Sequence, residues 1–236
     1  MGLADDISSK VKDYLDGDYD VTEANVIPSA KDVAFGKVAK KMPLCVFSID
    51  LRQSTNLLFS HNKQTAGKIH KSFLYAVSAV VKDNLGQIRS FNGDSLLAFW
   101  PAFKKYQINA CVFAAMSVKW LLDVALSPLF EKYEKLDFGI GVDLGEVFMV
   151  RAGLSGDADN NDLVFMGQCV NFAVAVGEQA QAPYHVGISP AVYNNLGDFL
   201  IHGTEYGRTV DIWRDGTVKW QGNAYPAKAT SWVRHF

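Results

Sequence analysis

The sequence predicts an α+β fold of the ferredoxin type, in which helices cover one face of a mixed sheet. From residue 44 onward, apolar strand-like segments alternate with segments of helical periodicity, and an Asn-Gly pair separates two β-prone runs. The predicted order is β-α-β-β-α-β, followed by extra strands near the C-terminal end. The composition agrees, because 49% of the 236 residues are hydrophobic and 20% are charged.

The first 42 residues differ from the rest of the chain. Residues 5–16 have the spacing of a short helix, whose apolar side carries Ile7, Val11, Tyr14 and Leu15. A polar stretch and a second short apolar-basic segment follow. We therefore expect an arm over residues 1–42, packed on the main domain or on a partner subunit, and a main domain over residues 43–236.

The first half of the main domain has clear signals. Residues 44–51 (LCVFSIDL) are a continuous apolar run that ends in an acid, as in a buried strand. Residues 63–84 are predicted to be a helix, because apolar residues recur there at steps of four, four and three. The runs QIRSF and DSLLAFW flank Asn92-Gly93, a dipeptide that favours a hairpin turn with positive φ at both central residues. Asp94 is therefore expected to begin the second strand of this hairpin.

The second half repeats this pattern. Residues 104–126 have a helical stripe, and residues 136–151 are predicted to form a second hairpin that turns at Leu144-Gly145. Beyond it we expect a strand near 162–166, a helix over 168–181, a strand over 184–188, a short helix after Pro190 and several β-like segments.

Charge and composition exclude several partner classes. Lys and Arg number 23 against 25 Asp and Glu, a net charge of −2, which argues against nucleic acid or an anionic membrane as a partner. The first 20 residues are acidic and polar, unlike a secretory signal, and no uninterrupted apolar run has the length of a membrane span. Three cysteines without a C-x-x-C pair suit a reducing compartment. We expect a cytoplasmic protein.

Two acids are the leading candidates for chemistry. Asp50 ends the first strand and Asp94 follows the hairpin turn, and in a β-α-β-β unit these two positions can converge at one edge of the sheet. Two carboxylates brought together repel unless a cation lies between them, and Mg²⁺ commonly takes one or two carboxylates plus phosphate oxygens. By residue type alone, a helix cap and a turn residue explain the two acids more simply.

Four motifs, taken in order, resemble those of the class III nucleotidyl cyclases. They are D-L-R-Q-S-T over residues 50–55, N-G-D-S-L-L-A-F over 92–99, G-I-G-V-D-L-G-E-V over 139–147 and G-Q-C-V-N-F-A over 167–173. One such motif alone would be unspecific, but the ordered set covers residues 44 to about 220.

The resemblance implies a cyclase palm and a reaction. A nucleoside triphosphate would be converted to a 3′,5′-cyclic monophosphate and pyrophosphate, with two Mg²⁺ or Mn²⁺ ions held by Asp50, Leu51 and Asp94. It also implies a head-to-tail homodimer, in which the partner's copy of Asn171 orients the ribose in the shared cleft. The free N–H groups of the strand-to-helix turn could hold the triphosphate, so the expected substrate-binding residues include Leu51, Arg52, Gln53, Ser54 and Thr55.

The positions that recognise a purine in this family differ here. Ser90 stands where the family has a lysine or glutamate, and Val164 where it has an aspartate or a similar polar residue. Neither can pair with a purine edge, although both are expected to contact substrate. This combination resembles the pyrimidine cyclases of the Pycsar antiphage systems, which make cyclic UMP or cyclic CMP as a signal for a separate effector protein. The resemblance favours UTP over CTP.

One catalytic cation of the family is missing, because Ala175 stands where the family usually has an arginine that stabilises the transferring phosphate. Lys219, which lies where the family often keeps a phosphate-binding lysine, is the expected replacement, and Arg52 and Arg151 are weaker candidates. Arg89 is a separate catalytic candidate, for a contact with the base or with a phosphate. Lys219 could equally be an ordinary surface lysine. Strand alternation places Arg89 and Ser90 on opposite faces, which argues against a role for Arg89.

Two other functions stay open. The chain could be an adenylate cyclase with an altered base pocket, or an inactive cyclase-like domain that binds nucleotide and regulates a partner. Ala175 favours the inactive domain, whereas Asp50, Asp94 and Asn171 favour an active enzyme. The scattered histidines and the lack of a histidine beside Ser54 or Ser95 argue against a zinc site and a hydrolase triad.

Overall fold

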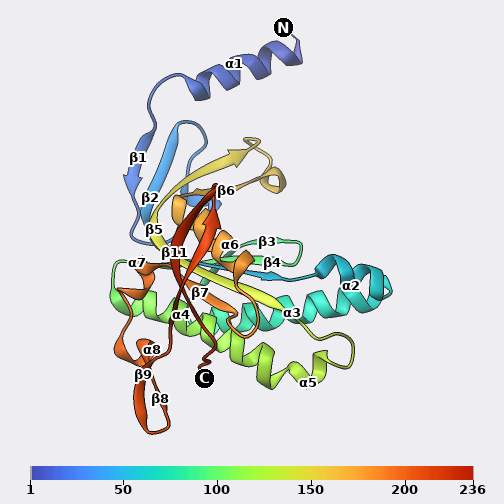
Figure 1. Ribbon diagram of the computed structural model, residues 1–236. Coiled ribbons are helices and arrows are strands. Elements are labelled where there is room, and N and C mark those ends of the chain that lie inside the picture. The colour runs from blue at the N-terminus through green and yellow to red at the C-terminus, as the bar shows by residue number, and fades with distance from the viewer. Residues whose placement is uncertain (1, 236) are drawn as a thin grey trace. The chain divides into compact units, whose positions relative to one another are not determined.

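The computed structural model describes residues 2–235 (Figure 1). The chain divides into two compact units. The smaller unit contains Met1–Met42 and Glu146–Gly167, and the larger contains Pro43–Gly145 and Gln168–Phe236. The chain passes between the units within the strands β2 (Val38–Leu51) and β5 (Phe138–Gly153). The division into an arm over residues 1–42 and a catalytic domain over 43–236 stays a prediction.

The smaller unit begins with the expected N-terminal helix, α1 (Leu3–Leu15), of which no residue is buried. Strand β1 (Asp20–Glu23) pairs in parallel with the start of β2, and β6 (Asn161–Met166) pairs antiparallel with the end of β5. Two 3₁₀ turns, η1 (Ala30–Asp32) and η3 (Ala158–Asn160), complete this unit. Lys41 joins its two segments, because the ammonium group lies 3.2 Å from both Glu23 and Glu146.

The larger unit contains the predicted α+β fold. Its strands lie in the order β10-β11-β7-β5-β2-β4-β3, and the run β5-β2-β4-β3 is the ferredoxin arrangement. The remaining bounds are β3 (Gln87–Asn92), β4 (Ser95–Pro101), β7 (Val186–Ile188), β10 (Arg214–Trp220) and β11 (Asn223–Thr230). Strand β7 runs parallel to β5, whereas β10 and β11 form an antiparallel hairpin, and β8 (His202–Glu205) and β9 (Arg208–Asp211) form a separate two-stranded sheet.

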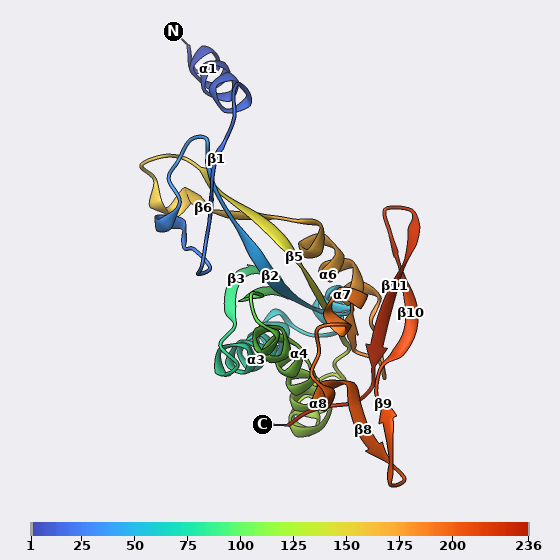
Figure 2. The same cartoon turned by 90° about the vertical axis from the view of Figure 1, so that its left-hand side faces the viewer.

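Two long helices, α3 (Lys63–Asp83) and α4 (Lys105–Trp120), cover one face of this sheet (Figure 2). The core between them includes the fully buried Phe47, Phe73, Trp100, Met116 and Ile140. The expected helix over residues 104–126 does not continue as an α-helix, because a π-helical turn, η2 (Leu121–Ala125), and the short α5 (Ser127–Phe130) follow α4. The stretch Lys105–Ala125 is long and apolar enough to cross a membrane, but more than half of its apolar window is buried inside the protein, as in a core helix.

Short helices complete the larger unit. They are α2 (Ser54–Ser60), which follows the turn after β2, α7 (Pro190–Tyr193), which begins at Pro190 where a short helix was expected, and α8 (Asp198–Ile201).

Helix α6 (Gln168–Gln179) lies against the opposite face of the sheet, so helices cover both faces (Figure 2). Glycines in β5 allow this approach. A Cβ on Gly141 would lie 1.9 Å from the Ala173 carbonyl oxygen, and one on Gly139 would lie 2.0 Å from that of Gly177. The hairpin expected at Leu144-Gly145 was therefore wrong. Strand β5 is continuous, and Gly145 accommodates Cys169 of α6, since a Cβ there would lie 3.1 Å from the Cys169 side chain.

The β3–β4 hairpin is confirmed, but its turn is shifted by one residue. Asn92 pairs with Ser95, so Gly93 and Asp94 are the two central residues of the turn. Gly93 has a φ of +63°, whereas Asp94 does not have positive φ, so only the first central residue adopts the left-handed conformation. Asp94 therefore lies at the tip of the hairpin and does not begin the second strand.

Candidate active site

Asp50 and Asp94 line one cavity of about 370 Å³ in the larger unit. Asp50 lies at the end of β2, where it pairs with Ser95 of β4, and Asp94 precedes Ser95 in the hairpin turn. The antiparallel pairing of β2 with β4 therefore brings the two acids to the same edge of the sheet, as the sequence predicted. The lining of the cavity also includes the polar residues Ser48, Ser90, Asn92, Ser95 and Glu178.

The electrostatics of this cavity favour a bound cation. Partial burial raises the pKa of Asp50, and the negative charges of Asp94 and Glu178 raise it further, while the charge of Arg52 opposes them. A buried carboxylate beside other carboxylates is destabilised in its charged form, and a cation between them removes this cost. Glu178 was not identified from the sequence, although it lies seven residues after Asn171 on the exposed side of the same helix.

The donors present suit Mg²⁺ or Mn²⁺ when substrate phosphate completes the coordination. Within residues 2–235, no group of three or more His, Cys, Asp or Glu side chains is arranged to hold a metal ion. Asp50 and Asp94 alone supply the one or two carboxylates that Mg²⁺ usually takes alongside phosphate oxygens. The side chain of Leu51 is buried in the core at 2% exposure, so only its backbone carbonyl is suited to a metal.

The turn after Asp50 lies beside a second cavity, of about 340 Å³. Arg52 and Gln53 line this cavity together with Asp137, whereas the lining of the Asp50–Asp94 cavity includes none of the residues from Leu51 to Thr55. Gln53 has a φ of +56° and is the N-cap of α2, which begins at Ser54. The expected substrate contacts of Leu51, Arg52, Gln53, Ser54 and Thr55 stay predictions.

Arg52 connects the end of β2 to the C-terminal end of α6. Its Nη2 donates hydrogen bonds to the carbonyl oxygens of Gly177 at 3.3 Å and Glu178 at 2.5 Å, and also to that of Ala180. The last carbonyls of a helix have no partner within the helix, so a cation here satisfies and stabilises them. Because Gly177 and Glu178 also line the Asp50–Asp94 cavity, Arg52 holds one wall of that cavity in place.

Asn171 and Lys219 are not among the residues that line the cavity of their own chain. Asn171 is exposed on α6, on the same side of the helix as Val174 and Glu178, which do line it. The Lys219 side chain projects from β10 and is exposed, while its backbone N–H and C=O each form a 2.9 Å hydrogen bond with the Gln179 side-chain amide.

Ala175, which replaces the family's arginine, is buried at 7% exposure. It packs with Phe172 and Val176 against Val218 and Ala227 of the β10–β11 hairpin. The hairpin therefore covers this position within a single chain.

A β-bulge in β3 places Ser90, but not Arg89, on the cavity. The register of β3 against β4 shifts between Ile88 and Ser90, so Arg89 is the extra residue of the bulge. Ser90 lines the cavity, whereas Arg89 does not, and the Arg89 guanidinium donates a hydrogen bond of 2.5 Å to the Gln87 side chain.

Two other predicted candidates belong to the smaller unit. Val164 lies in β6 opposite Val150 and is 42% exposed. Arg151 stacks on Phe35, with its guanidinium carbon 4.3 Å from the ring centroid, and donates two hydrogen bonds to the Asn161 side chain, at 3.0 and 2.8 Å. The Arg151 guanidinium therefore has its partners within its own unit.

Comparisons with known proteins identify the family. No protein-family model matches the chain. A uridylate cyclase from Burkholderia cepacia is 30% identical over 220 residues, which are 90% of this chain and 91% of that protein. A uridylate cyclase from Rhodovulum sp. (strain MB263) is 29% identical over 225 residues, 90% of this chain and 89% of that protein.

A solved structure agrees with the sequence comparison. The adenylyl cyclase CyaB from P. aeruginosa superposes with a TM-score of 0.68 at 18% identity, over 81% of this chain and 95% of that one. The predicted cyclase fold is therefore confirmed. Together with the curated relatives, these comparisons show that the chain is a nucleotidyl cyclase of class III and belongs to the family whose curated members are named uridylate cyclase.

Proposed function

We propose that this nucleotidyl cyclase converts UTP to 3′,5′-cyclic UMP and pyrophosphate in a metal-dependent reaction. The observation that carries the proposal is the pair of acids, Asp50 and Asp94, on a cavity whose base-reading position is the small, neutral Ser90. The names of the curated relatives support UTP as the substrate.

Asp50 and Asp94, with the Leu51 carbonyl, would hold two Mg²⁺ or Mn²⁺ ions. When bound, these ions supply the positive charge that activates the ribose 3′-hydroxyl and stabilises the transferring phosphoryl group. The protein's own part is to fix both carboxylates at the sheet edge through the β2–β4 pairing. Arg52 fixes the facing end of α6.

Ser90 suits a pyrimidine because a hydroxyl both donates and accepts hydrogen bonds. The edge of uracil presents carbonyl oxygens beside an N–H, and a hydroxyl can pair with either. A lysine at this position can only donate hydrogen bonds to the base, and a charged glutamate can only accept them. The expected contact of Val164 with the base belongs to the same proposal.

A homodimer would complete the site. Asn171 and Lys219 are exposed and do not line the cavity of their own chain, so a head-to-tail partner is the expected route by which their side chains reach a nucleotide. In this arrangement the partner's copy of Asn171 orients the ribose, and Lys219 neutralises phosphate charge in place of the arginine that Ala175 replaces. Arg89 is the candidate for a further contact with the base or a phosphate.

The biological role that we propose is antiviral defence. Cyclic UMP made in the cytoplasm would act as a second messenger for a separate effector protein, and neither nucleic acid nor a membrane would take part. The resemblance to the Pycsar cyclases supports this role.

The decisive experiment offers each of the four ribonucleoside triphosphates separately to the purified protein with Mn²⁺, and identifies products by mass spectrometry. Cyclic UMP from UTP is the expected result. Cyclic CMP or cyclic AMP as the main product would contradict UTP specificity, and the absence of product from all four would indicate an inactive nucleotide-binding domain. The Asp94→Asn variant is the control for contaminating activity.

A further inference from the structure

A network of ionisable side chains that the proposed chemistry does not use lies between α4 and the starts of β5 and β7. Its members, here called the charged network, are Lys119, Asp123, His185 and Asp137. Lys119 is in α4 and Asp123 in η2, while Asp137 directly precedes β5 and His185 directly precedes β7. The side chains of Lys119 and His185 are only 5% and 6% exposed. Burial of such groups is costly unless each finds a partner, and here each one does.

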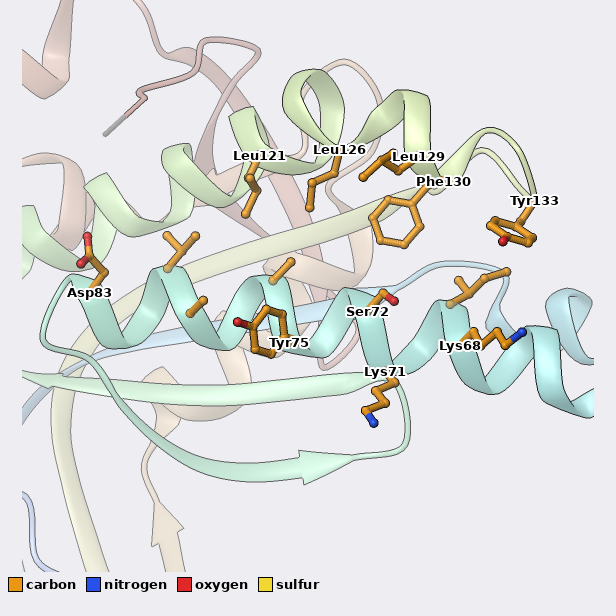
Figure 3. Close-up of a pocket in the computed structure, with 14 residues that line it drawn as sticks. Lys68, Lys71, Ser72, Tyr75, Asp83, Leu121, Leu126, Leu129, Phe130 and Tyr133 are labelled. Carbon is orange, nitrogen blue, oxygen red and sulfur yellow. The ribbon is translucent and has the colours of Figure 1, made fainter.

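The π-helical turn η2 supplies one acid of this network. The Leu126 N–H donates to the Leu121 carbonyl oxygen at 2.8 Å, a bond that spans five residues where an α-helix spans four. Figure 3 shows Leu121 and Leu126 on the side of this segment that faces α3, across an apolar groove of about 870 Å³. Asp123 is not among the residues that line the groove, and its carboxylate pairs with Lys119 and His185. The segment therefore presents an apolar side to α3 and an acidic side chain to His185.

His185 lies between two carboxylates. Its Nδ1 is 3.0 Å from Asp123 Oδ2, and its Nε2 is 3.1 Å from Asp137 Oδ1. A carboxylate accepts hydrogen bonds and cannot donate them, so Nε2 is the donor to Asp137. Burial alone would raise the pKa of Asp123, but the hydrogen bonds and charges of His185 and Lys119 outweigh burial and lower this pKa. The imidazole ring stacks on Phe138, with centroids 4.3 Å apart and planes at 22°, which holds both nitrogens in these directions.

Asp137 connects His185 to Arg52. The Arg52 backbone N–H donates to the Asp137 carbonyl oxygen at 2.9 Å, and the Asp137 carboxylate lies 4.0 Å from Arg52 Nε. Another nitrogen of the same guanidinium, Nη2, donates to carbonyl oxygens at the end of α6, including that of Glu178 at 2.5 Å. Burial and the neighbouring acids raise the pKa of Asp50, and the Arg52 charge opposes them. A series of contacts thus leads from His185 to one wall of the cavity and to the charge of one of its acids.

We propose that His185 is a positioning residue for the cyclase reaction, although it is not among the residues that line the cavity. By donating to Asp137 it fixes the guanidinium of Arg52, and Arg52 in turn fixes the end of α6 that carries Glu178. The rest of the charged network holds the other side of the imidazole ring. The proposal rests on the proposed cyclase function of the cavity, but not on UTP as its substrate.

Two amide substitutions test which side of the ring matters. The amide nitrogen of asparagine reaches the position of Nδ1 and that of glutamine the position of Nε2, so His185→Asn keeps a donor toward Asp123 and His185→Gln keeps one toward Asp137. Both variants lose the stack on Phe138 and should be destabilised to a similar extent in urea. We expect kcat per folded protein to fall about tenfold in His185→Asn and to stay within about twofold of the native value in His185→Gln. A purely structural role predicts equal losses, and His202→Asn, on the exposed side of β8, is the control.

A double-mutant cycle tests the route through Arg52. Arg52→Ala removes the link, so adding His185→Asn to it should not lower kcat further. Hydrogen exchange gives a readout without substrate. The backbone amides of residues 175–181 should exchange about tenfold faster in His185→Asn than in His185→Gln, because the end of α6 is released.

Three results would overturn the proposal. They are equal kcat values for the two amide variants, losses of Arg52→Ala and His185→Asn that multiply, and equal exchange rates at the end of α6. A native protein that forms no product from any triphosphate would contradict the proposed function of the cavity, whereas the exchange measurement would still decide whether His185 positions α6.

Discussion

Asp94 raises the pKa of Asp50, although helices α2 and α3 and strand β3 separate the two acids along the chain. Burial of Asp50 is the larger cause, and the negative charge of Asp94 adds to it because the β2–β4 pairing places Asp50 opposite Ser95. The protein thus folds with the charged form of Asp50 destabilised by burial and by a neighbouring carboxylate. Arrangements of this kind are typical of functional sites, where binding of a cation offsets the cost.

Removal of either carboxylate should abolish cyclase activity. Asp50→Asn and Asp94→Asn keep the shape of the side chain but remove a charged ligand, so the rate of cyclic nucleotide formation should fall about a hundredfold or more. The measurement is product by mass spectrometry, with circular dichroism to verify folding. Asp215→Asn, which alters an exposed acid on β10, should retain full activity. Near-normal turnover by either active-site variant would remove that residue from the site.

The Asp50→Asn substitution should stabilise the metal-free protein at neutral pH. An acid whose pKa is raised on folding contributes most to stability when protonated, below its ordinary value of 3.8, and loses that contribution as the pH rises through the raised pKa. At pH 7 charged Asp50 therefore opposes folding, so Asp50→Asn should raise the Tm. The difference should shrink as the pH approaches 3.8. A lower Tm for the variant at pH 7 would contradict this electrostatic account.

Metal ions should reverse the order of stability. In the presence of EDTA the native protein should melt below the Asp50→Asn variant, whereas Mn²⁺ at about a hundred times its Kd should stabilise the native protein by about 2.7 kcal/mol. The variant lacks one ligand, so its Tm should respond little to Mn²⁺. Differential scanning calorimetry with and without the ion measures both effects, and an equal response of the two proteins would argue against a metal at Asp50.

Arg52 should matter for stability as well as for activity. Arg52→Ala leaves the carbonyls of Gly177 and Glu178 without their charged donor, so the free energy of unfolding should fall by about 2 kcal/mol. Urea denaturation measures this change, and activity should fall with it because the α6 wall of the cavity loses its support. Arg208→Ala, on the exposed strand β9, is the matched control. Unchanged stability of Arg52→Ala would show that this contact contributes nothing to the fold.

Two glycine substitutions should have opposite effects. Gly141→Ala places a methyl group 1.9 Å from the Ala173 carbonyl oxygen, so α6 must move, and the loss should be about 3 kcal/mol or more. Gly67→Ala lies in α3 with nothing within 4 Å of the added Cβ, and should stabilise the protein by about 0.5–1 kcal/mol. Thermal unfolding of both variants gives the comparison, and tolerance of Gly141→Ala would mean that α6 does not approach β5 so closely.

Much of this architecture could be predicted because it depends on local patterns. The helix in α3 follows from apolar residues spaced by three and four, and the β3–β4 hairpin follows from a turn sequence between two β-prone runs. The convergence of Asp50 and Asp94 was predictable for the same reason, since Asp50 ends β2 and Asp94 lies in the turn that precedes β4, and the ferredoxin order implies that these two strands pair.

Other features depend on contacts between residues far apart in the sequence. A glycine at position 145 suits a hairpin turn as well as a strand that a helix approaches closely. Only the position of Cys169 shows that the second applies. Similarly, the three carbonyls that Arg52 contacts become available only where α6 ends beside β2, and the bulge that turns Ser90 toward the cavity arises from the register of β3 against β4. The sequence by itself predicts the strands, the helices and the positions of the two acids at the ends of strands, because these depend on neighbours along the chain. The packing of α6 on the sheet decided the third carboxylate of the cavity, Glu178, and the role of Arg52, because close approach and charge proximity exist only between surfaces that folding has brought together.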